Sequence, residues 1–202
     1  DCLKVSFVPL YLPPIILVAT CLLAISTILC TQKLLVTNLP GGLLMEDHNL
    51  KADFIAAMRC VASTVYVISA KSIVEKHAMT AISVTSLSMS PPSVLVCVNK
   101  EASIHNLLSQ DSLFCINTLS REQESLSKVC SESEEGESRF NDPAWIEDKN
   151  YVFNCNSLSN IFCKCIDTID HTSHTIFIAE VKATQNNESS EPLIYQSGNY
   201  LK

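Results

Sequence analysis

The pattern of hydrophobic and polar positions divides the chain into two unlike parts. Residues 5–32 contain no charged side chain, and Lys4 and Lys33 stand on either side of them. After about residue 47, short apolar runs alternate with polar connections, as in a folded domain. The pattern therefore predicts an apolar N-terminal extension with a linker over residues 1–44 and one domain over residues 45–202.

The N-terminal extension is open to three interpretations. Three prolines, Pro9, Pro13 and Pro14, interrupt its first half, which leaves residues 15–30 as an unbroken apolar run. That run is short for a membrane span and close to the hydrophobic core of a signal peptide. The extension is thus a membrane anchor, a targeting segment or sequence foreign to the native protein. Residues 36–44, which contain Pro and Gly, form the linker in each case.

The domain reads as mainly β structure with short helices. β-Branched and aromatic runs predict strands at residues 64–70, 78–88, 93–99, 113–119, 159–169, 174–184 and 193–197. Short helices are predicted at residues 103–110 and 121–130, and an earlier one with Leu50, Phe54 and Met58 on its apolar face. Because the strands do not alternate with long helices, a closed antiparallel barrel is favoured over a doubly wound parallel sheet.

Composition and charge narrow the classes of function. The hydrophobic content of 47% suffices for a packed core, and the net charge of −7 without any basic run argues against a nucleic-acid surface. The ten cysteines include no C-x-x-C pair, and His171 and His174 are too close for a zinc-finger spacing. We therefore expect no metal site, reduced thiols and a cytoplasmic location for the domain.

The run from Thr80 to His105, TAISVTSLSMSPPSVLVCVNKEASIH, carries the densest candidate chemistry. It combines hydroxyl side chains, a Pro-Pro turn, an apolar strand and an Asn-Lys-x-x-Ser-x-His loop. Hydroxyls with a few cationic or imidazole donors at strand ends suit a flat, phosphorylated cofactor. No glycine occurs in the run, and no G-x-G-x-x-G occurs anywhere in the chain, which excludes a Rossmann dinucleotide fingerprint.

Six strings in this chain carry a resemblance to one known family. They are FIAAMRCVASTVYVIS at 54–69, MTAISVTSLSMSPPSVLVCVNKEASIH at 79–105, FCINTLS at 114–120, RF at 139–140, HTSHTIFIAEV at 171–181 and PLIYQSGNY at 192–200. In this order and spacing, residues 50–202 resemble the flavin reductase family of the FMN-binding split-barrel fold. The resemblance implies an antiparallel, Greek-key-like split β-barrel with short flanking helices.

The resemblance also implies an activity and its partners. It implies an NAD(P)H-dependent flavin reductase that binds FMN, with FAD or riboflavin as alternatives and NADH or NADPH as the hydride donor. Members of the family commonly form homodimers and supply reduced flavin to a partner monooxygenase. The rival hypothesis is a flavin-binding or electron-transfer protein of the same fold without turnover. A third is a membrane-tethered redox module, which requires that residues 5–32 be an anchor.

The resemblance assigns roles to particular positions. The flavin-lining segment comprises Thr80, Ala81, Ser83, Val84, Thr85 and Ser86. The phosphate and ribityl end comprises Asn99, Lys100, Ser103 and His105. His174 is the candidate catalytic residue, placed where it meets the nicotinamide or the flavin edge. Tyr200 is a further pocket neighbour, whereas core packing is the expected role of Phe140.

Two features of the sequence bear on turnover and on the choice of nicotinamide. The family usually has Gly where this chain has Ala78, Thr172 and Ala179, and the change at Thr172 lies beside His174. In addition, a nicotinamide 2′-phosphate needs a cation. The candidates for that cation are Lys71, Lys76, Arg121 and Arg139.

Overall fold

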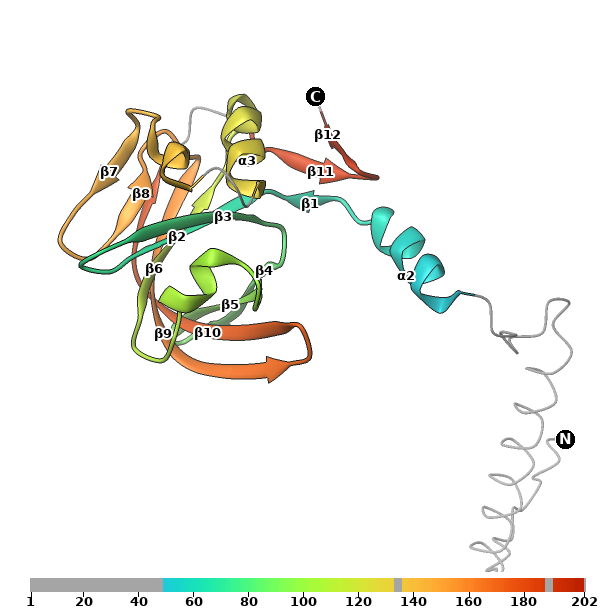
Figure 1. Ribbon diagram of the computed structural model, residues 1–202, viewed down its shortest axis with the longest axis horizontal. Helices are drawn as coiled ribbons and strands as arrows, with labels where there is room; N and C mark the ends of the chain where they lie inside the picture. The colour runs from blue at the N-terminus through green and yellow to red at the C-terminus, as the bar shows by residue number, and fades with distance from the viewer. Residues whose placement is uncertain (1–48, 133–135, 188–190, 202) are drawn as a thin grey trace, which may run out of the picture. The chain divides into compact units, whose positions relative to one another are not determined.

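The computed structural model describes residues 49–132, 136–187 and 191–201 (Figure 1). The chain divides into two compact units, residues 1–53 and residues 54–202. The three interpretations of residues 1–44 lie outside the described residues. Within the described ranges, no helix is both long and apolar enough to cross a membrane.

Helix α2 (Leu50–Arg59) confirms the first predicted helix, and its apolar face is exposed. The helix buries none of its residues. Phe54 remains 63% exposed and Met58 51% exposed. The 3.6-residue periodicity therefore predicted the helix correctly, but none of the described residues buries its apolar face.

The centre of the domain is a seven-stranded antiparallel sheet. Its strands are β2 (Tyr66–Lys71), β3 (Lys76–Ala81), β4 (Val84–Met89), β5 (Pro92–Asn99), β6 (Leu113–Thr118), β9 (Ser159–His171) and β10 (His174–Asn186). Their order is β3-β2-β6-β9-β10-β5-β4. Because β3 and β4 are the two edges and do not pair with each other, the sheet is open, and the expectation of a closed barrel was wrong. The mainly β, antiparallel fold class is confirmed.

Shorter elements cover the sheet. A small sheet joins β1 (Ser63–Thr64), β11 (Ile194–Gln196) and β12 (Asn199–Leu201), and a second pairs β7 (Trp145–Glu147) with β8 (Val152–Asn154). The helical segments are α3 (Glu124–Ser131) and the 3₁₀ turns η1 (Ser103–Leu107), η2 (Arg121–Gln123) and η3 (Gly136–Phe140). Helix α3, η1 and η3 all contact β3, so one sheet edge gathers most of the helical structure (Figure 1).

The predicted strand over residues 78–88 is in fact two strands at opposite edges of the sheet. The chain leaves β3 at Ala81 and joins β5 as β4 from Val84. Ser83 fixes the crossing, since its carbonyl accepts from the Cys97 amide at 3.1 Å and its hydroxyl donates to the Cys97 carbonyl at 3.0 Å. No Gly or Pro marks this corner in the sequence, which is why the apolar pattern reads as continuous.

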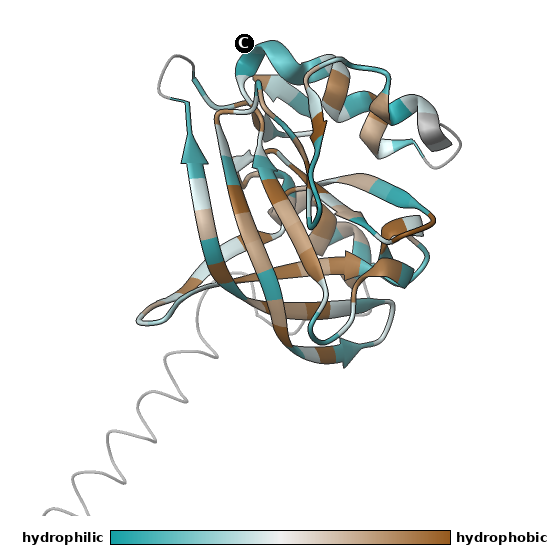
Figure 2. Cartoon of the chain, turned by 90° about the vertical axis from the view of Figure 1, so that its left-hand side faces the viewer, coloured by the Kyte–Doolittle hydropathy of each residue, from teal (hydrophilic) through white to brown (hydrophobic). Residues whose placement is uncertain are grey.

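The core consists of two hydrophobic clusters on the two faces of the sheet. Neighbouring residues of β2 point to opposite faces, so Ile68 belongs to one cluster and Val67 to the other. The first cluster includes Phe114 and Phe177, and the second includes Leu126 from α3. Figure 2 shows apolar residues concentrated along the middle of the strands and polar residues toward the loops.

Candidate functional site

A cavity of about 620 Å³ opens at the end of β3. It lies between the Asn99–Ser103 segment, the end of α3, η3 and the β11–β12 hairpin. The residues that line it are Val65, Met79, Thr80, Ala81, Ile82, Asn99, Glu101, Ala102, Ser103, Cys130, Ser131, Glu132, Arg139, Tyr195 and Tyr200. Its volume falls in the usual range for sites of small molecules and cofactors.

Three elements are tied together along one wall of the cavity. The Thr80 hydroxyl donates to the Ser127 carbonyl of α3 at 2.6 Å. The Ser127 hydroxyl lies 2.8 Å from the Tyr200 hydroxyl on β12. Tyr200 also packs edge-to-face on Tyr195, with ring centroids 5.2 Å apart. These contacts hold two aromatic rings beside the sheet edge, where they can pack against a flat ligand.

Arg139 brings a buried positive charge to the cavity. Its side chain is only 4% exposed. Its Nη1 donates to the Ala78 carbonyl at 2.7 Å, and its Nη2 donates to the Glu132 carbonyl. The Trp145 indole donates to the Arg139 carbonyl at 2.9 Å and packs on Phe140 with centroids 4.9 Å apart. Trp145 and Phe140 therefore position η3, and with it the guanidinium.

Four of the predicted cofactor-binding residues line this cavity. They are Thr80, Ala81, Asn99 and Ser103. The Asn99 side chain accepts from the Glu101 amide at 3.0 Å, which shapes the turn that follows β5. Ser103 begins η1, a 3₁₀ turn of five residues where the sequence indicated a longer helix. The structure thus brings together residues from the two halves of the Thr80–His105 run.

The remaining residues of the predicted flavin-lining segment lie outside the cavity of a single chain. Ser83 is held by β5, and Val84 packs partly buried against the first core cluster. Thr85 and Ser86 are exposed on β4, opposite Leu95 and Val94 of β5. Their backbone pairs with β5 on one side only, because β4 is an edge strand, and both residues are exposed to solvent in this chain.

Lys100, His105 and His174 belong to a second polar cluster, at the β9–β10 hairpin. Lys100 lies 3.4 Å from the Asp170 carboxylate. Thr175 donates to the same Asp170 oxygen at 2.7 Å, and the His105 Nε2 lies 2.9 Å from the Thr175 hydroxyl. The Thr175 bond, followed by the Lys100 charge, lowers the pKa of Asp170. His174 is exposed, with its Nδ1 2.9 Å from the Ser173 hydroxyl.

The three positions where the family usually has Gly differ in their backbone. Ala78 and Ala179 lie within strands and are fully buried. Thr172, in the β9–β10 turn, has a φ of 45°. A β-branched residue in this left-handed region is strained, whereas glycine adopts it freely. The departure at Thr172 is therefore the one with a backbone cost, and it lies next to the segment that presents His174.

The sequence singled out Arg139 only as one of four candidate cations, and it missed Tyr195 and Cys130 as cavity residues. The RF string was the signal for Arg139, but nothing in that string shows that the side chain is buried in the cavity wall. Burial raises the pKa of Cys130 to about 12, against the opposing Arg139 charge, so the thiol is neutral. Among the described side chains, no group of three His, Cys, Asp or Glu could hold a metal ion.

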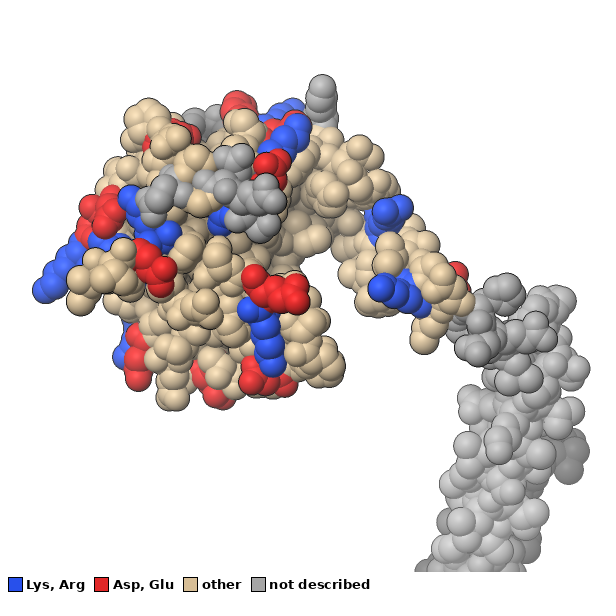
Figure 3. Space-filling view, viewed as in Figure 1, with Lys and Arg blue, Asp and Glu red and all other residues tan. Residues whose placement is uncertain are grey.

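The cavity fits a flavin nucleotide in shape and donor set. The aromatic pair and the open side of β3 suit a flat ring system that carries carbonyls and ring nitrogens on its edge. The Arg139 Nε is buried without a hydrogen-bond partner among the described residues, which leaves a charged donor for a ligand anion. On the face of the molecule shown in Figure 3, basic and acidic side chains are interspersed, so no broad basic patch competes for such a ligand.

Comparison with known proteins agrees with this geometry. Residues 58–202 match the family described as flavin reductase like domain. The chain is 33% identical over 159 residues to the reductase component of a FADH₂-dependent resorcinol hydroxylase from Rhizobium sp. strain MTP-10005, which covers 77% of this chain and 89% of that protein. It is 30% identical over 170 residues to the NADH-dependent FMN reductase RutF of Yersinia enterocolitica, covering 82% and 92%.

The fold of this chain is also similar to that of a solved flavin reductase structure. The flavin reductase of styrene monooxygenase from Pseudomonas putida S12 superimposes with a TM-score of 0.67 at 27% identity, covering 74% of this chain and 96% of that one. The open antiparallel sheet is therefore the split barrel that the sequence resemblance implied. On the matched region, the relatives and the shared fold together, the chain belongs to the flavin reductase like family.

Proposed function

We propose that this chain is an NAD(P)H-dependent flavin reductase that binds FMN and supplies reduced flavin to a partner monooxygenase. The observation that carries the proposal is the cavity at the end of β3, where Thr80, Ala81, Asn99 and Ser103 meet the Arg139 guanidinium. A flavin held by these residues would supply the redox chemistry together with the nicotinamide.

The protein's own contribution is to bind and orient. Edge strand β3 offers backbone donors and acceptors to the ring edge at its Thr80–Ala81 end, and Tyr195 and Tyr200 offer aromatic surface on one side of the cavity. Holding two flat rings in near contact accounts for much of the rate enhancement in such a transfer. No strong acid or base is required at the reacting atoms, which agrees with a cavity lined mainly by hydroxyl, aromatic and apolar groups.

His174 is proposed to contact the nicotinamide at the mouth of the site. It pairs with the cavity residue Asn99 across β10 and β5, so only the width of one strand pair separates it from the cavity. Its exposed ring is free to meet a second substrate that approaches from solvent. We expect His174→Ala to raise the KM for NADH severalfold and leave the FMN dissociation constant within about twofold, because it lies outside the flavin cavity. A weakened FMN affinity would contradict this role.

Assembly as a homodimer is part of the proposal. β4 leaves Leu87 51% and Met89 79% exposed beside Thr85 and Ser86. A second copy that covers this edge would also bring the family's flavin-lining hydroxyls into an enclosed site.

The named relatives include one described with FADH₂ and one with FMN and NADH, so FMN with NADH is the first combination to test and FAD the second. We place this domain in the cytoplasm.

Anaerobic titration of the purified protein with FMN and then with NADH or NADPH tests the function. A flavin reductase binds FMN, and its visible absorbance is bleached by one nicotinamide or both. If FMN binds but neither nicotinamide bleaches it, the protein is a flavin-binding or electron-transfer protein instead. If no flavin binds at all, the proposed function is wrong.

A further inference from the structure

Arg139 is a buried cation whose hydrogen bonding is incomplete. It donates to two backbone carbonyls, those of Ala78 and Glu132, while its Nε has no acceptor among the described residues. No described carboxylate lies within ion-pair distance of it. A guanidinium removed from water is unfavourable unless an anion compensates the lost hydration. The wall of the cavity at Arg139 therefore favours an anionic ligand.

The other candidate cations already have carboxylate partners. Lys100 pairs with Asp170 at 3.4 Å, at the β9–β10 hairpin and outside the cavity lining. Glu147 binds both Lys71 and Lys76, and Glu191 binds Arg121. Of these five cations, Arg139 alone lines the cavity. The cluster of Lys100 and His105 that the sequence favoured for a phosphate is instead satisfied within the protein.

The surroundings of Arg139 select the kind of anion. A planar guanidinium offers parallel donors that match two oxygens of one phosphate group. The Ser103 hydroxyl oxygen accepts from the Arg139 Nη1 at 3.5 Å and lines the same cavity, so its own O–H adds a neutral donor for a ligand. Glu101 and Glu132, whose side chains are exposed at the cavity, repel an anion near solvent and favour one held deep beside Arg139.

The geometry points to Arg139, and not Lys100, as the residue that anchors the phosphate of the nucleotide in this cavity. The inference rests on the proposed function, since it names the group that fixes the phosphorylated end of the bound cofactor. Both FMN and the nicotinamide nucleotide carry phosphates, so the shared chemistry is a phosphate ester. The two sources are separated by comparing ligands that have and lack that group.

The test compares equilibrium binding of FMN and riboflavin, which share the ring and ribityl chain and differ by the phosphate. Quenching of flavin fluorescence gives both dissociation constants for the wild type, Arg139→Met, Arg139→Lys, Lys100→Met and Arg121→Met. We expect the wild type to prefer FMN by about tenfold or more, as one charge-assisted hydrogen bond provides. Arg139→Met should bring the ratio close to one with riboflavin binding retained, and Arg139→Lys should be intermediate. Lys100→Met and the surface control Arg121→Met should keep the wild-type ratio.

A second arm covers the nicotinamide as the source of the phosphate. If Arg139→Met keeps the FMN preference but weakens NADH binding, while half-saturation by the phosphate-free donor 1-benzyl-1,4-dihydronicotinamide is unchanged, Arg139 anchors the nicotinamide phosphate. That result also supports the inference. If Arg139→Met alters neither comparison, or if Lys100→Met collapses the FMN preference, the inference is overturned.

Controls keep the test decisive if Arg139→Met does not fold. Inorganic phosphate should then weaken FMN binding but not riboflavin binding to the wild type, and should do so less for Arg139→Lys. Equal effects of phosphate on both flavins, or none, would overturn the inference. A wild type that binds riboflavin and FMN equally contradicts the role of Arg139 while flavin binding stands. A wild type that binds neither contradicts the proposed function itself.

Discussion

The cavity at the end of β3 and the polar cluster at the β9–β10 hairpin are neighbours, and they differ in how the positive charge of a basic side chain is compensated. In the cavity, Arg139 is almost fully buried and, among the described residues, donates to two backbone carbonyls and the Ser103 hydroxyl, with no carboxylate partner. At the hairpin, Lys100 is exposed and paired with Asp170, which Thr175 also binds. Asn99 connects the two regions, since it lines the cavity and pairs with His174.

The contrast shows that the bonding state of a polar group, and not its presence in the sequence, decides whether it is available to a ligand. The hairpin contains Lys100 and His105, which the sequence singled out, but both are already engaged with Asp170 and Thr175. The cavity has an aromatic pair and a cation whose Nε has no hydrogen-bond partner among the described residues. A ligand gains most where the protein has left donors unused, because it replaces no existing bond.

The largest expected effect is on the aromatic wall of the cavity. Tyr200→Ala should weaken FMN and riboflavin binding alike by about tenfold or more, the usual loss when a stacking aromatic is removed from a flat base. Tyr200→Phe keeps the ring and loses only the contact with Ser127, so its affinity should stay within about threefold of the wild type. The control is Tyr151→Ala, because Tyr151 packs on Phe162 away from the cavity. Equal loss in Tyr151→Ala would remove the distinction between the regions.

The next effect concerns the strained turn of the hairpin. Thr172→Gly should raise the free energy of unfolding by up to about 1 kcal/mol, because relief of the positive φ outweighs the added chain entropy of glycine. Ser173→Gly, at the next position, gains no such relief and should be destabilising by about 0.5–1 kcal/mol. Urea denaturation measures both. A destabilised Thr172→Gly would show that the turn carries no strain.

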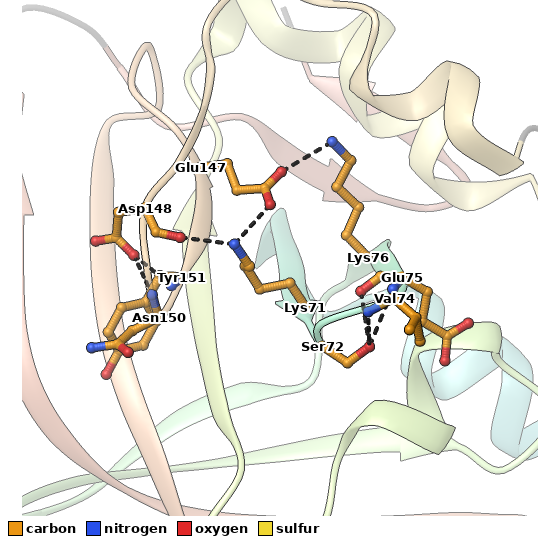
Figure 4. A network of polar contacts seen from close by, with 9 residues as sticks. All are labelled: Lys71, Ser72, Val74, Glu75, Lys76, Glu147, Asp148, Asn150 and Tyr151. Carbon is orange, nitrogen blue, oxygen red and sulfur yellow. Dashed lines mark hydrogen bonds and ion pairs between the residues drawn. The ribbon is translucent and has the colours of Figure 1, made fainter.

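A smaller effect is expected where lysines are paired at the surface outside the cavity lining and the hairpin cluster. Glu147 bridges Lys71, at 2.7 Å, and Lys76, at 3.2 Å, beside the β2–β3 turn (Figure 4). Because these groups are partly exposed, Glu147→Gln should lower the free energy of unfolding by less than about 1 kcal/mol, and less still at high salt. Flavin binding should be unchanged. A large, salt-independent loss would mean that this network is structural in the way that the Arg139 contacts are.

The smallest effect is the acid dependence of the hairpin. The folded pKa of Asp170 is lowered by Thr175 and Lys100, so its contribution to stability is present above the unfolded pKa of about 3.9 and is lost as pH falls through the folded value. Asp170→Asn should therefore have a slightly lower melting temperature than the wild type above about pH 5. The two curves should converge in more acidic solution. A difference that persists at the lowest pH would assign the effect to packing.

Much of the fold could be read from local patterns. The strands, the short helices and the antiparallel class follow from apolar periodicity, and six strings in order indicated the family. The break between β3 and β4 could not be predicted, because Ile82 and Ser83 carry no turn signal and the crossing depends on hydrogen bonds to β5. The exposure of the apolar face of α2 could not be predicted for a related reason, since amphipathic spacing shows that a face is apolar and not what covers it.

The candidate site divides in the same way. The sequence by itself determined the flavin reductase like family, because residue type and order carry that information. It placed ten residues in one cofactor site, and the structure brings four of them, Thr80, Ala81, Asn99 and Ser103, to the cavity. Only the tertiary structure decided which cation faces the cavity. Lys100 and Arg139 are both basic residues. In the structure Lys100 is exposed and pairs with Asp170, whereas Arg139 lies on η3, which Trp145 contacts, and is buried. Such choices depend on contacts between distant segments, which no local pattern contains.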